Sequence, residues 1–580
     1  MSSLKHSVIT KHDIQLVIKL KGIFGKLISS ILYNILGLKS LNKMYNHCFD
    51  NDGERFVENC LNYKNNKIKV YPQDLSHIPG SGACVILFNH PFGALEALMT
   101  YGVLMKKRKD VKFVANFLLS RVEPLQNVLV QVNPFENKKE VFSNFVGAKA
   151  MHKVIEEGGL LCIFAAGEVS TKYKNSKYIE DKAWPQNIMR FIKTVNAPVI
   201  SGFIDGQNSR SFHLLGKINP LFRTVSLPRQ LLNKKNLEVC LRFSPPLSAK
   251  NIKQIENNKL LAEFLKSRTY LLKHKAFVNT SVIQKEYAEL VEAQNKDLLI
   301  EEIEKIKKTN LLFSSENYLV FFVQKKDIPL IFQDLARSRE ITFREIGEGT
   351  GNASDFDAYD EYYNHLFIWD ELANALVGAY RIGMGKHIIE KYGKNGFYLN
   401  TLFKFNQGFD KYLEKSMEMG RSFIVQEYQK KTLPLFLLWK GIYFVTQKYP
   451  EYKYLIGPAS ISSIYSENSK ILIIEFLKRY HAWNEVSEFV QARNKFEYKL
   501  NHHHEKVFEV YKNDLSLMDR LIRDIDINHY SMPVLIKKYL SLGGKILDFN
   551  IDPEFNFAID GLVILDIGVV SQEVINSYNK

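Results

Sequence analysis

The sequence predicts an α/β protein with two domains, and three observations lead to this prediction. The chain has 580 residues, whereas one domain core holds ~150. In each half, short apolar runs alternate with helical segments, a pattern typical of a sheet covered by helices. The stretch between the halves has no Gly and no Pro and is predicted to form a helical connector. The predicted organisation is a helical segment at 1–50, a first domain at 51–250, the connector at 251–310 and a second domain at 311–580.

The composition is that of a basic globular protein. Lys and Arg number 78 against 62 Asp and Glu, and the net charge of +16 favours an acidic partner such as nucleic acid, an anionic membrane surface or an acidic carrier protein. No basic stripe with interleaved aromatic residues occurs, so nucleic acid is not expected. The five cysteines form no CxxC pair, which predicts buried thiols in a reducing compartment. Neither a membrane-spanning helix nor a secretory signal is expected.

Residues 14–38 show the pattern of an amphipathic basic helix. Apolar residues recur at three- and four-residue steps, while Lys19, Lys26 and Asn34 occupy other faces. Two interpretations stay open. The helix lies in an anionic membrane surface with its lysines at the headgroups, or it packs its apolar stripe on the core of the protein itself.

The first predicted domain places a histidine and a carboxylate at one turn. Residues 83–88, 111–116, 160–164 and 197–204 are predicted buried strands, and FNHPFGALEAL follows the first of them. His90 therefore stands at a strand-to-helix turn, where open α/β sheets bind ligands. A turn through Pro91 and Gly93 brings Glu96 back to the imidazole, which gives a dyad able to activate a hydroxyl. The alternative is a structural histidine in a turn.

The second predicted domain contains a dense charged cluster. The strand candidates are NYLVFFV, NALVGAYRI, GFYLNTLF, RSFIVQEY and KYLIGPASI, and a helix and a strand follow in the tail. Arg339, Arg344, Glu345, Asp357 and Asp360 lie close together in the sequence between apolar runs. They are either a solvated loop with surface ion pairs or a cluster that folds over an acceptor carrying an amino group and a carboxylate.

The run Asn501-His502-His503-His504-Glu505 raises the question of a metal site. Adjacent histidines point in different directions and seldom converge on one ion. We therefore predict that this run lies in a loop or at an interdomain surface, and we expect no metal.

The first half resembles the glycerolipid-type acyltransferases, and more closely their hemolysin-like, aminolipid-forming branch. NHPFGALEA is similar to the first motif of that family, IFAAGEVS at 163–170 takes the place of a Phe-Pro-x-Gly motif, and 197–235 continues the likeness. The Arg that engages a glycerol phosphate in the wider family is absent. The resemblance spans about 60–250. It implies that His90 and Glu96 are catalytic, and that the substrate is bound by Asn89, Gly93, Gly167 and Glu168.

The second half resembles the acetyltransferase-like (GNAT) fold of autoinducer synthases and of ornithine-type N-acyltransferases. The matches are Phe343-Arg344, Asp357-x-x-Asp360, Gly378-Ala379-Tyr380-Arg381 and Glu418-x-Gly420-Arg421-Ser422, with further likeness at 428–442, at 455–462 and in the tail. The resemblance spans about 311–570. It implies that Glu418 is the base for an attacking amine, and that the substrates are positioned by Arg344, Asp357, Asp360, Arg381 and Arg421.

Together the two resemblances imply a bifunctional aminolipid synthase. The second half would attach a 3-hydroxyacyl chain to the α-amine of ornithine or glycine, and the first half would acylate the 3-hydroxyl. The pyrophosphate loop of coenzyme A-dependent members is absent, which implies acyl carrier protein as donor and partner, with coenzyme A thioesters left open, and no tightly bound cofactor. The implied location is peripheral, at the cytoplasmic face of a bacterial inner membrane. The alternatives are a lysophospholipid acyltransferase with a non-catalytic second domain and a membrane-binding, hemolysin-like protein.

Overall fold

The computed structural model contains two compact units, each described by itself. It describes residues 7–18, 22–116, 121–132, 140–173, 178–218, 220–273 and 287–579. The first unit consists of Met1–Ala276 and Leu500–Lys512, and the second of Phe277–Lys499 and Asn513–Lys580. A short helix late in the sequence, α22 (His502–Tyr511), thus belongs with the N-terminal half of the chain. The predicted domain boundaries themselves remain predictions.

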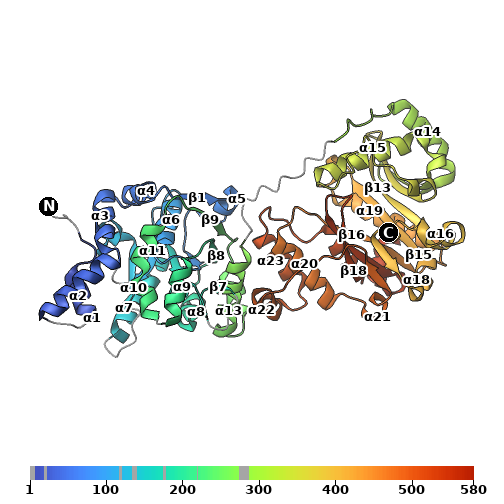
Figure 1. The fold of residues 1–580 in the computed structure, drawn as a ribbon. Coiled ribbons are helices and arrows are strands. Elements are labelled where there is room, and N and C mark those ends of the chain that lie inside the picture. The colour runs from blue at the N-terminus through green and yellow to red at the C-terminus, as the bar shows by residue number, and fades with distance from the viewer. Residues whose placement is uncertain are drawn as a thin grey trace. The chain divides into compact units, whose positions relative to one another are not determined.

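The first unit is built on a sheet that has, within the described residues, 7 strands in the order β1-β9-β8-β2-β5-β3-β4 (Figure 1). The strands are β1 (Lys67–Val70), β9 (Glu238–Phe243), β8 (Val199–Ile204), β2 (Cys84–Phe88), β5 (Leu160–Phe164), β3 (Val111–Asn116) and β4 (Leu129–Val132). Neighbouring strands run parallel except for β8 and β9. Every residue of β2 and β8 is buried, as expected for strands with helices on both faces.

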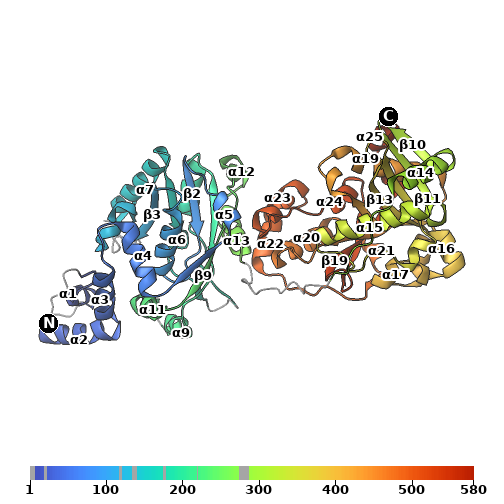
Figure 2. The same ribbon diagram turned by 90° about the horizontal axis from the view of Figure 1, so that it is seen from above.

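Helices cover both faces of this sheet (Figure 2). They are α3 (Leu38–Cys48), α4 (Gly53–Tyr63), α5 (Pro72–Ser76), α6 (Leu95–Leu104), α7 (Glu140–Glu156), α8 (Gln186–Thr194), α9 (Arg210–Ile218), α10 (Pro220–Val225), α11 (Leu227–Asn233), α12 (Ala249–Gln254) and α13 (Asn258–Leu271). Alternate β2 side chains, Cys84, Ile86 and Phe88, pack in one core with residues of α4 and α6. Two further short strands, β6 (Thr171–Lys172) and β7 (Ile179–Glu180), form a small ribbon.

The predicted helix at 14–38 is wrong in its extent. The structure has α1 (Lys11–Ile18) and α2 (Gly22–Ile35), and residues 19–21 lie outside the described part. Gly22 and Gly37 both have a φ of 76°, a left-handed conformation that interrupts a helix and that glycine adopts at little cost. No helix in the described part of the chain is long and apolar enough to cross a membrane.

The second unit is built on a mixed sheet whose order, over the described residues, is β10-β11-β12-β13-β15-β16-β19-β18. The strands are β10 (Leu311–Ser315), β11 (Tyr318–Gln324), β12 (Asn364–Asp370), β13 (Ala375–Met384), β15 (Ser416–Ile424), β16 (Tyr454–Ile461), β19 (Ala558–Asp566) and β18 (Lys545–Asp552). β15 and β16 are parallel, and the other pairs are antiparallel. The β15–β16 pairing covers only Ser416–Glu418 opposite Tyr454–Ile456.

Helices lie on both faces of this second sheet. They are α14 (Lys296–Asn310), α15 (Pro329–Glu345), α16 (Gly385–Tyr392), α17 (Leu399–Leu402), α18 (Asp410–Glu414), α19 (Thr432–Lys448), α20 (Glu467–Tyr480), α21 (Asn484–Ser487), α23 (Leu515–Ile525), α24 (Val534–Ser541) and α25 (Gln572–Asn579). α14 and α15 share a core with one face of β11 and β12, and α19 packs on the other face through Gly441, which lies against Val320 and Leu366. The strand predicted at GFYLNTLF is wrong, because Leu399–Leu402 is helical and only β14 (Phe403–Phe405) is extended; it pairs with β17 (Val490–Ala492).

Candidate active sites

His90 and Glu96 form the predicted dyad in the first unit. His90 follows the carboxyl end of β2, and its Nδ1 lies 2.7 Å from Oε1 of Glu96 in the first turn of α6. The Glu96 side chain is fully buried, whereas the His90 side chain is 16% exposed and stacks on Phe164. The imidazole is thus held by one nitrogen and is not sealed in the core, which suits a group that exchanges protons with a substrate.

The backbone of the turn fixes the carboxylate as well. Oε1 of Glu96 accepts the N–H groups of Phe92 at 2.9 Å and Gly93 at 2.8 Å. Burial disfavours its charged form, yet His90 and these two N–H groups hold the pKa of Glu96 below its ordinary value. Gly93 has a φ of 110°, and a Cβ there would meet Leu227 at 2.8 Å, so only glycine fits this turn.

The carboxylate of Glu96 raises the pKa of His90. Burial alone would lower the pKa of His90, but the charge and hydrogen bond of Glu96 outweigh burial and raise it above the ordinary value. The imidazolium formed when His90 takes a proton is therefore stabilised by Glu96, as expected for a general base with a carboxylate behind it.

Asp181 is a part of this site that the sequence did not reveal. Its Oδ1 accepts the backbone N–H of His90 at 3.2 Å and the hydroxyl of Ser170 at 2.5 Å, and its Oδ2 accepts Trp184 Nε1 at 3.0 Å. The backbone N–H of Asp181 in turn donates to the Tyr270 hydroxyl. Asp181 is 91 residues from His90 in the sequence and follows no motif, so only the fold brings them together.

The four predicted substrate-binding residues of this unit lie around the dyad. Asn89 ties β2 to β8, because its amide donates to the carbonyl of Ile204 and accepts the N–H of the same residue. Gly167 has a φ of 67° and open space around it. Glu168 accepts Arg223 at 2.7 Å and lies 3.1 Å from Lys182. Substrate binding by these residues stays a prediction.

Glu418 is buried where β15 and β16 stop pairing in the second unit. One carboxylate oxygen accepts the N–H of Leu399 at 2.7 Å, and the other accepts the hydroxyl of Tyr363. Burial raises the pKa of Glu418 to about 7, and the hydrogen bond from Tyr363 opposes this rise. A carboxylate with such a pKa takes and releases a proton at neutral pH, which is what a general base requires.

Most of the predicted charged residues of this unit form a buried ion network. Arg381 lies 2.5 Å from Asp357 and 3.3 Å from Asp360, and Arg421 lies 3.4 Å from Asp357. Arg339, a member of the predicted charged cluster, lies 2.9 Å from Asp360. Asp355, which the sequence does not single out, completes the network and lies 3.1 Å from Arg339 and 3.3 Å from Arg421. The interpretation of a solvated loop is wrong here, because Arg339, Asp355, Asp360 and Arg381 are buried and pair with one another, while Asp357 and Arg421 are partly buried beside them.

Arg344 stands apart from this network. Its Nε donates to Glu340 one turn earlier at 2.8 Å, and its Nη2 donates to the carbonyls of Ala288 and Asn352. The structure thus gives Arg344 contacts that join α15 to neighbouring chain segments, and its predicted contact with substrate stays a prediction.

A second group of buried acids lies near Arg421. Glu348, Asp552 and Asp560 are each less than a tenth exposed. Burial raises the pKa of Glu348 to about 7 and that of Asp560 well above its ordinary value, and the neighbouring carboxylates add to both shifts. The sequence does not reveal this group, because Glu348 lies far along the chain from Asp552 and Asp560.

The histidine run starts a helix, so the prediction of a loop is wrong, whereas its predicted place at an interdomain surface stays a prediction. Asn501 caps α22, and His503 packs flat on Tyr270 at 4.8 Å within the first unit. Nε2 of His502 and Nε2 of His503 each lie 3.2 Å from Glu180. The Ser267 hydroxyl lies 3.1 Å from Nδ1 of His503. These side chains therefore form a packed polar cluster.

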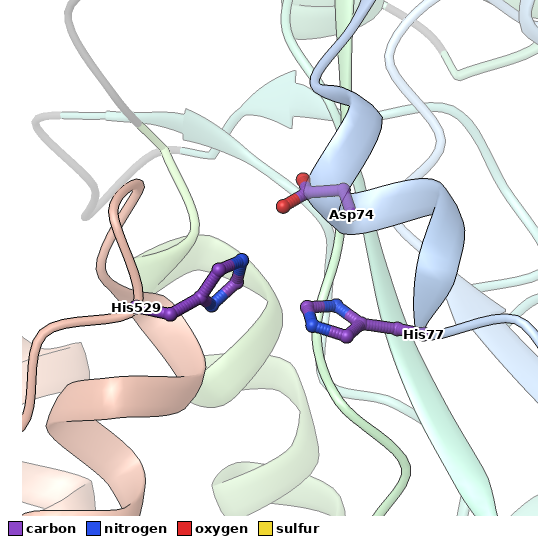
Figure 3. A group of neighbouring side chains, drawn as sticks. All are labelled: Asp74, His77 and His529. Atoms are coloured by element: carbon purple, nitrogen blue, oxygen red, sulfur yellow. The ribbon is translucent and has the colours of Figure 1, made fainter.

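Asp74 and His77 make a comparable structural contact on α5. Figure 3 shows both side chains extending from this helix. Asp74 accepts Arg242 Nε at 2.6 Å and the backbone N–H of Phe243 at 2.9 Å, and His77 Nδ1 lies 2.9 Å from the carbonyl of Phe243. Both residues therefore anchor α5 to β9. His529, also drawn there, belongs to the second unit.

Comparison with known families supports the family resemblance predicted for each half of the chain. A family model described as acyltransferase matches residues 30–278, and one described as acetyltransferase (GNAT) domain matches residues 338–439. The protein is a two-domain acyltransferase. The predicted fold class and enzyme class are thus confirmed.

Three curated relatives of this acyltransferase each align with less than half of it. A glycine N(alpha)-acyltransferase of Bacteroides thetaiotaomicron is 26% identical over 283 residues, 46% of this chain and 82% of that protein. A lyso-glycine lipid O-acyltransferase of Phocaeicola vulgatus is 21% identical over 272 residues, 45% of this chain and 94% of that protein. An L-ornithine N(alpha)-acyltransferase of Rhizobium meliloti is 27% identical over 232 residues, 39% of this chain and 70% of that protein.

Proposed function

We propose that this acyltransferase makes an acyloxyacyl amino-acid lipid in two consecutive steps. The GNAT domain transfers a 3-hydroxyacyl chain to the α-amine of an amino acid, either glycine or ornithine. The N-terminal domain then acylates the 3-hydroxyl of that product. Two kinds of relative support this order, because some are named N-acyltransferases and others a lyso-lipid O-acyltransferase.

The first step uses Glu418. The carboxylate takes a proton from the amine, directly or through water, and the amine nitrogen attacks the thioester carbonyl. The new C–N bond forms, the C–S bond breaks, and the proton ends on the departing thiol. The pKa of about 7 at Glu418 suits both halves of this transfer, since the group accepts the proton and gives it back near neutral pH.

The second step uses His90 and Glu96. The free imidazole nitrogen of His90 takes the proton of the 3-hydroxyl while Nδ1 stays on Glu96. The hydroxyl oxygen attacks a second thioester, an ester forms, and the imidazolium returns its proton to the leaving thiolate. No covalent acyl-enzyme is needed, since the hydroxyl is itself the nucleophile.

The acyl donor in this proposal is an acyl carrier protein, and the acceptor is presented at an anionic membrane surface. A net charge of +16 supports both partners, since each is acidic. The exposed residues of α2 support the membrane contact. Ile23, Leu27, Ile31 and Ile35 recur every four residues and are 85%, 57%, 48% and 56% exposed. Such a stripe is costly in water and is stabilised when buried in a membrane interface.

The observation that carries the proposal is the His90–Glu96 pair at the end of β2 in one unit, together with the buried carboxylate of Glu418 where two parallel strands stop pairing in the other. The test uses the purified full chain with glycine or ornithine and a 3-hydroxyacyl thioester of acyl carrier protein. We expect an N-acylated amino acid, which gains the mass of a second acyl chain once a fatty-acyl thioester is added. Acylation of lysophospholipid without any N-acylated amino acid would overturn the proposal in favour of a single-activity enzyme.

A further inference from the structure

A polar cavity lies beside the His90 turn. It has a volume of about 350 Å³ and is formed by the loop after β8 together with α9 and α11. Its lining includes Gln207, Asn208, Arg210, His213, Gln230 and Lys234. Two of these side chains are cations, and no carboxylate is among the residues that line it.

Phe92 connects this cavity to the dyad. Asn208 Nδ2 donates to the carbonyl of Phe92 at 3.0 Å, and Lys234 Nζ lies 4.6 Å from the centre of the Phe92 ring. Phe92 also donates its N–H to Glu96 and is two residues from His90. A ligand in the cavity is therefore separated from the imidazole by little more than one residue of the turn.

The cavity offers the chemistry that recognises an N-acylated amino acid. Asn208 is 3% exposed, and its Oδ1 has no hydrogen-bond partner in the part of the chain that the structure describes. Because its Nδ2 is engaged by Phe92, Oδ1 is left to accept a donor such as an amide N–H. Lys234 Nζ donates to the carbonyl of Gln207 at 3.3 Å and has further hydrogens to donate. Among the described residues no carboxylate lies within ion-pair distance of Lys234 or Arg210, so both cations can pair with an anion in the cavity.

The helix that lines the cavity continues into exposed apolar residues. Leu214 and Leu215 follow His213 on α9 and are 59% and 36% exposed, and Phe222 on α10 is 49% exposed. An acceptor lipid has a polar head and an apolar chain, and this surface places a polar cavity next to an apolar face.

We propose that the cavity binds the head group of the lipid acceptor. Lys234 and Arg210 hold its carboxylate, and Asn208 accepts its amide N–H, so that the 3-hydroxyl, a few bonds away, reaches His90. The cations of the lining would repel a cationic side chain, so the site favours N-acylglycine over N-acylornithine. This assignment rests on the proposed O-acylation by the N-terminal domain.

The test measures O-acylation by the full chain with N-(3-hydroxyacyl)glycine and with the matching glycinamide, which lacks the negative charge. We expect the carboxylate acceptor to be preferred by about tenfold or more in kcat/KM. Lys234→Gln and Arg210→Gln should each raise KM for the carboxylate acceptor severalfold while leaving the amide acceptor nearly unchanged. Lys235→Gln, the neighbouring lysine outside the cavity, is the control and should behave as wild type.

Two results separate this inference from the function on which it rests. Equal use of both acceptors by the wild type, or an unchanged KM in both cavity variants, would overturn the cavity assignment while O-acylation itself stands. Absence of O-acylation with either acceptor would overturn the proposed function. The cavity assignment then stands only if calorimetry shows that the wild type binds N-acylglycine and that Lys234→Gln weakens this binding about tenfold, and it falls if the two proteins bind alike.

Discussion

Glu96 sets the pH range in which His90 works. Because Glu96 raises the pKa of His90, we expect kcat/KM for O-acylation to rise with pH through a value above the ordinary 6.5, as the imidazole loses its proton and becomes a base. In Glu96→Gln burial still lowers the pKa of His90, and of the two carboxylates that raise it only Asp181 remains, so the rise of kcat/KM should occur at lower pH. The plateau rate should also fall about 10²–10⁴-fold, because the imidazolium is no longer stabilised.

The control for this experiment is Glu58→Gln, which changes an exposed glutamate of α4. It should leave both the pH of this rise and the plateau unchanged. If kcat/KM for O-acylation rises at the same pH in Glu96→Gln as in the wild type, then Glu96 does not determine the pKa of His90.

Glu418 should set the pH dependence of N-acylation. Loss of its hydrogen-bond partner Tyr363 should shift this dependence to higher pH, the opposite direction to the shift expected for His90 in Glu96→Gln. The wild-type rate should rise with pH through about 7 as Glu418 ionises. The Tyr363 hydroxyl lowers the pKa of Glu418, so Tyr363→Phe should move this rise to higher pH. Tyr392→Phe changes an exposed hydroxyl and serves as the control. If the N-acylation rate rises at the same pH in Tyr363→Phe and in Tyr392→Phe, or if Glu418→Gln still catalyses N-acylation, then Glu418 is not the base.

Asp360 is expected to stabilise the fold of the second unit. It is fully buried between Arg339 and Arg381, and breaking a buried pair leaves a charge without a partner, which costs about 3–5 kcal/mol. Asp360→Asn should therefore lower the free energy of unfolding by that amount, measured with urea on the full chain. Glu345→Gln, an exposed position on α15, should change it by less than about 0.5 kcal/mol. An Asp360→Asn protein of normal stability that fails to bind amino acid would instead favour direct substrate contact.

The sequence predicts a site residue well when its partners are near it in the chain. His90 and Glu96 lie within one turn, and the residue types around them leave few other arrangements. Asp181 and Tyr363 each reach the site from a distant segment, through strand order that no local pattern encodes. The network around Asp360 shows the same limit, since a run of charged residues looks alike whether it is solvated or buried.

At the scale of elements, the exposed stripe of α2 makes a testable membrane contact. Leu27→Glu or Ile31→Glu puts a charge where the helix would enter the interface, and burial of each such side chain contributes about 1.5–3 kcal/mol. We expect binding to vesicles that contain phosphatidylglycerol to weaken about tenfold, as measured by sedimentation. Asn34→Glu adds the same charge at an exposed position off the stripe, and its effect should be much smaller. Equal weakening in all three variants would mean that charge alone, and not the apolar stripe, binds the vesicles.

The sequence predicts an element best when its pattern of residues fits one type of secondary structure better than the others. β2 and β8 are short runs rich in Val and Ile, each followed by a polar loop, which is typical of a strand buried on both faces. GFYLNTLF failed because a short apolar and aromatic run suits a buried helix turn as well as a strand. The helix at 14–38 failed because apolar periodicity continues across Gly22, whose positive φ interrupts the helix without changing the pattern.

At the scale of the whole molecule, the two proposed activities predict which lipid accumulates when each is removed. Cells that express the wild type should contain a phosphorus-free amino-acid lipid with two acyl chains, which mass spectrometry identifies. This lipid should be ninhydrin-negative if the amino acid is glycine and ninhydrin-positive if it is ornithine, whose δ-amine stays free. His90→Ala should leave the N-terminal step without its base, so the mono-acylated amino acid should accumulate in its place. Glu418→Gln should yield neither species, because the hydroxyl acceptor for the second step is never made.

Supplying the missing intermediate tests the order directly. Glu418→Gln cells given N-(3-hydroxyacyl)glycine should recover the two-chain lipid, since the N-terminal domain is intact in that variant. Double-variant cells carrying His90→Ala as well should not recover it. If His90→Ala instead abolishes both lipids while Glu418→Gln leaves the mono-acylated species intact, the roles of the two domains are reversed. These outcomes differ because the proposal assigns the amine and the hydroxyl to two different bases, Glu418 and His90, which lie in separate units.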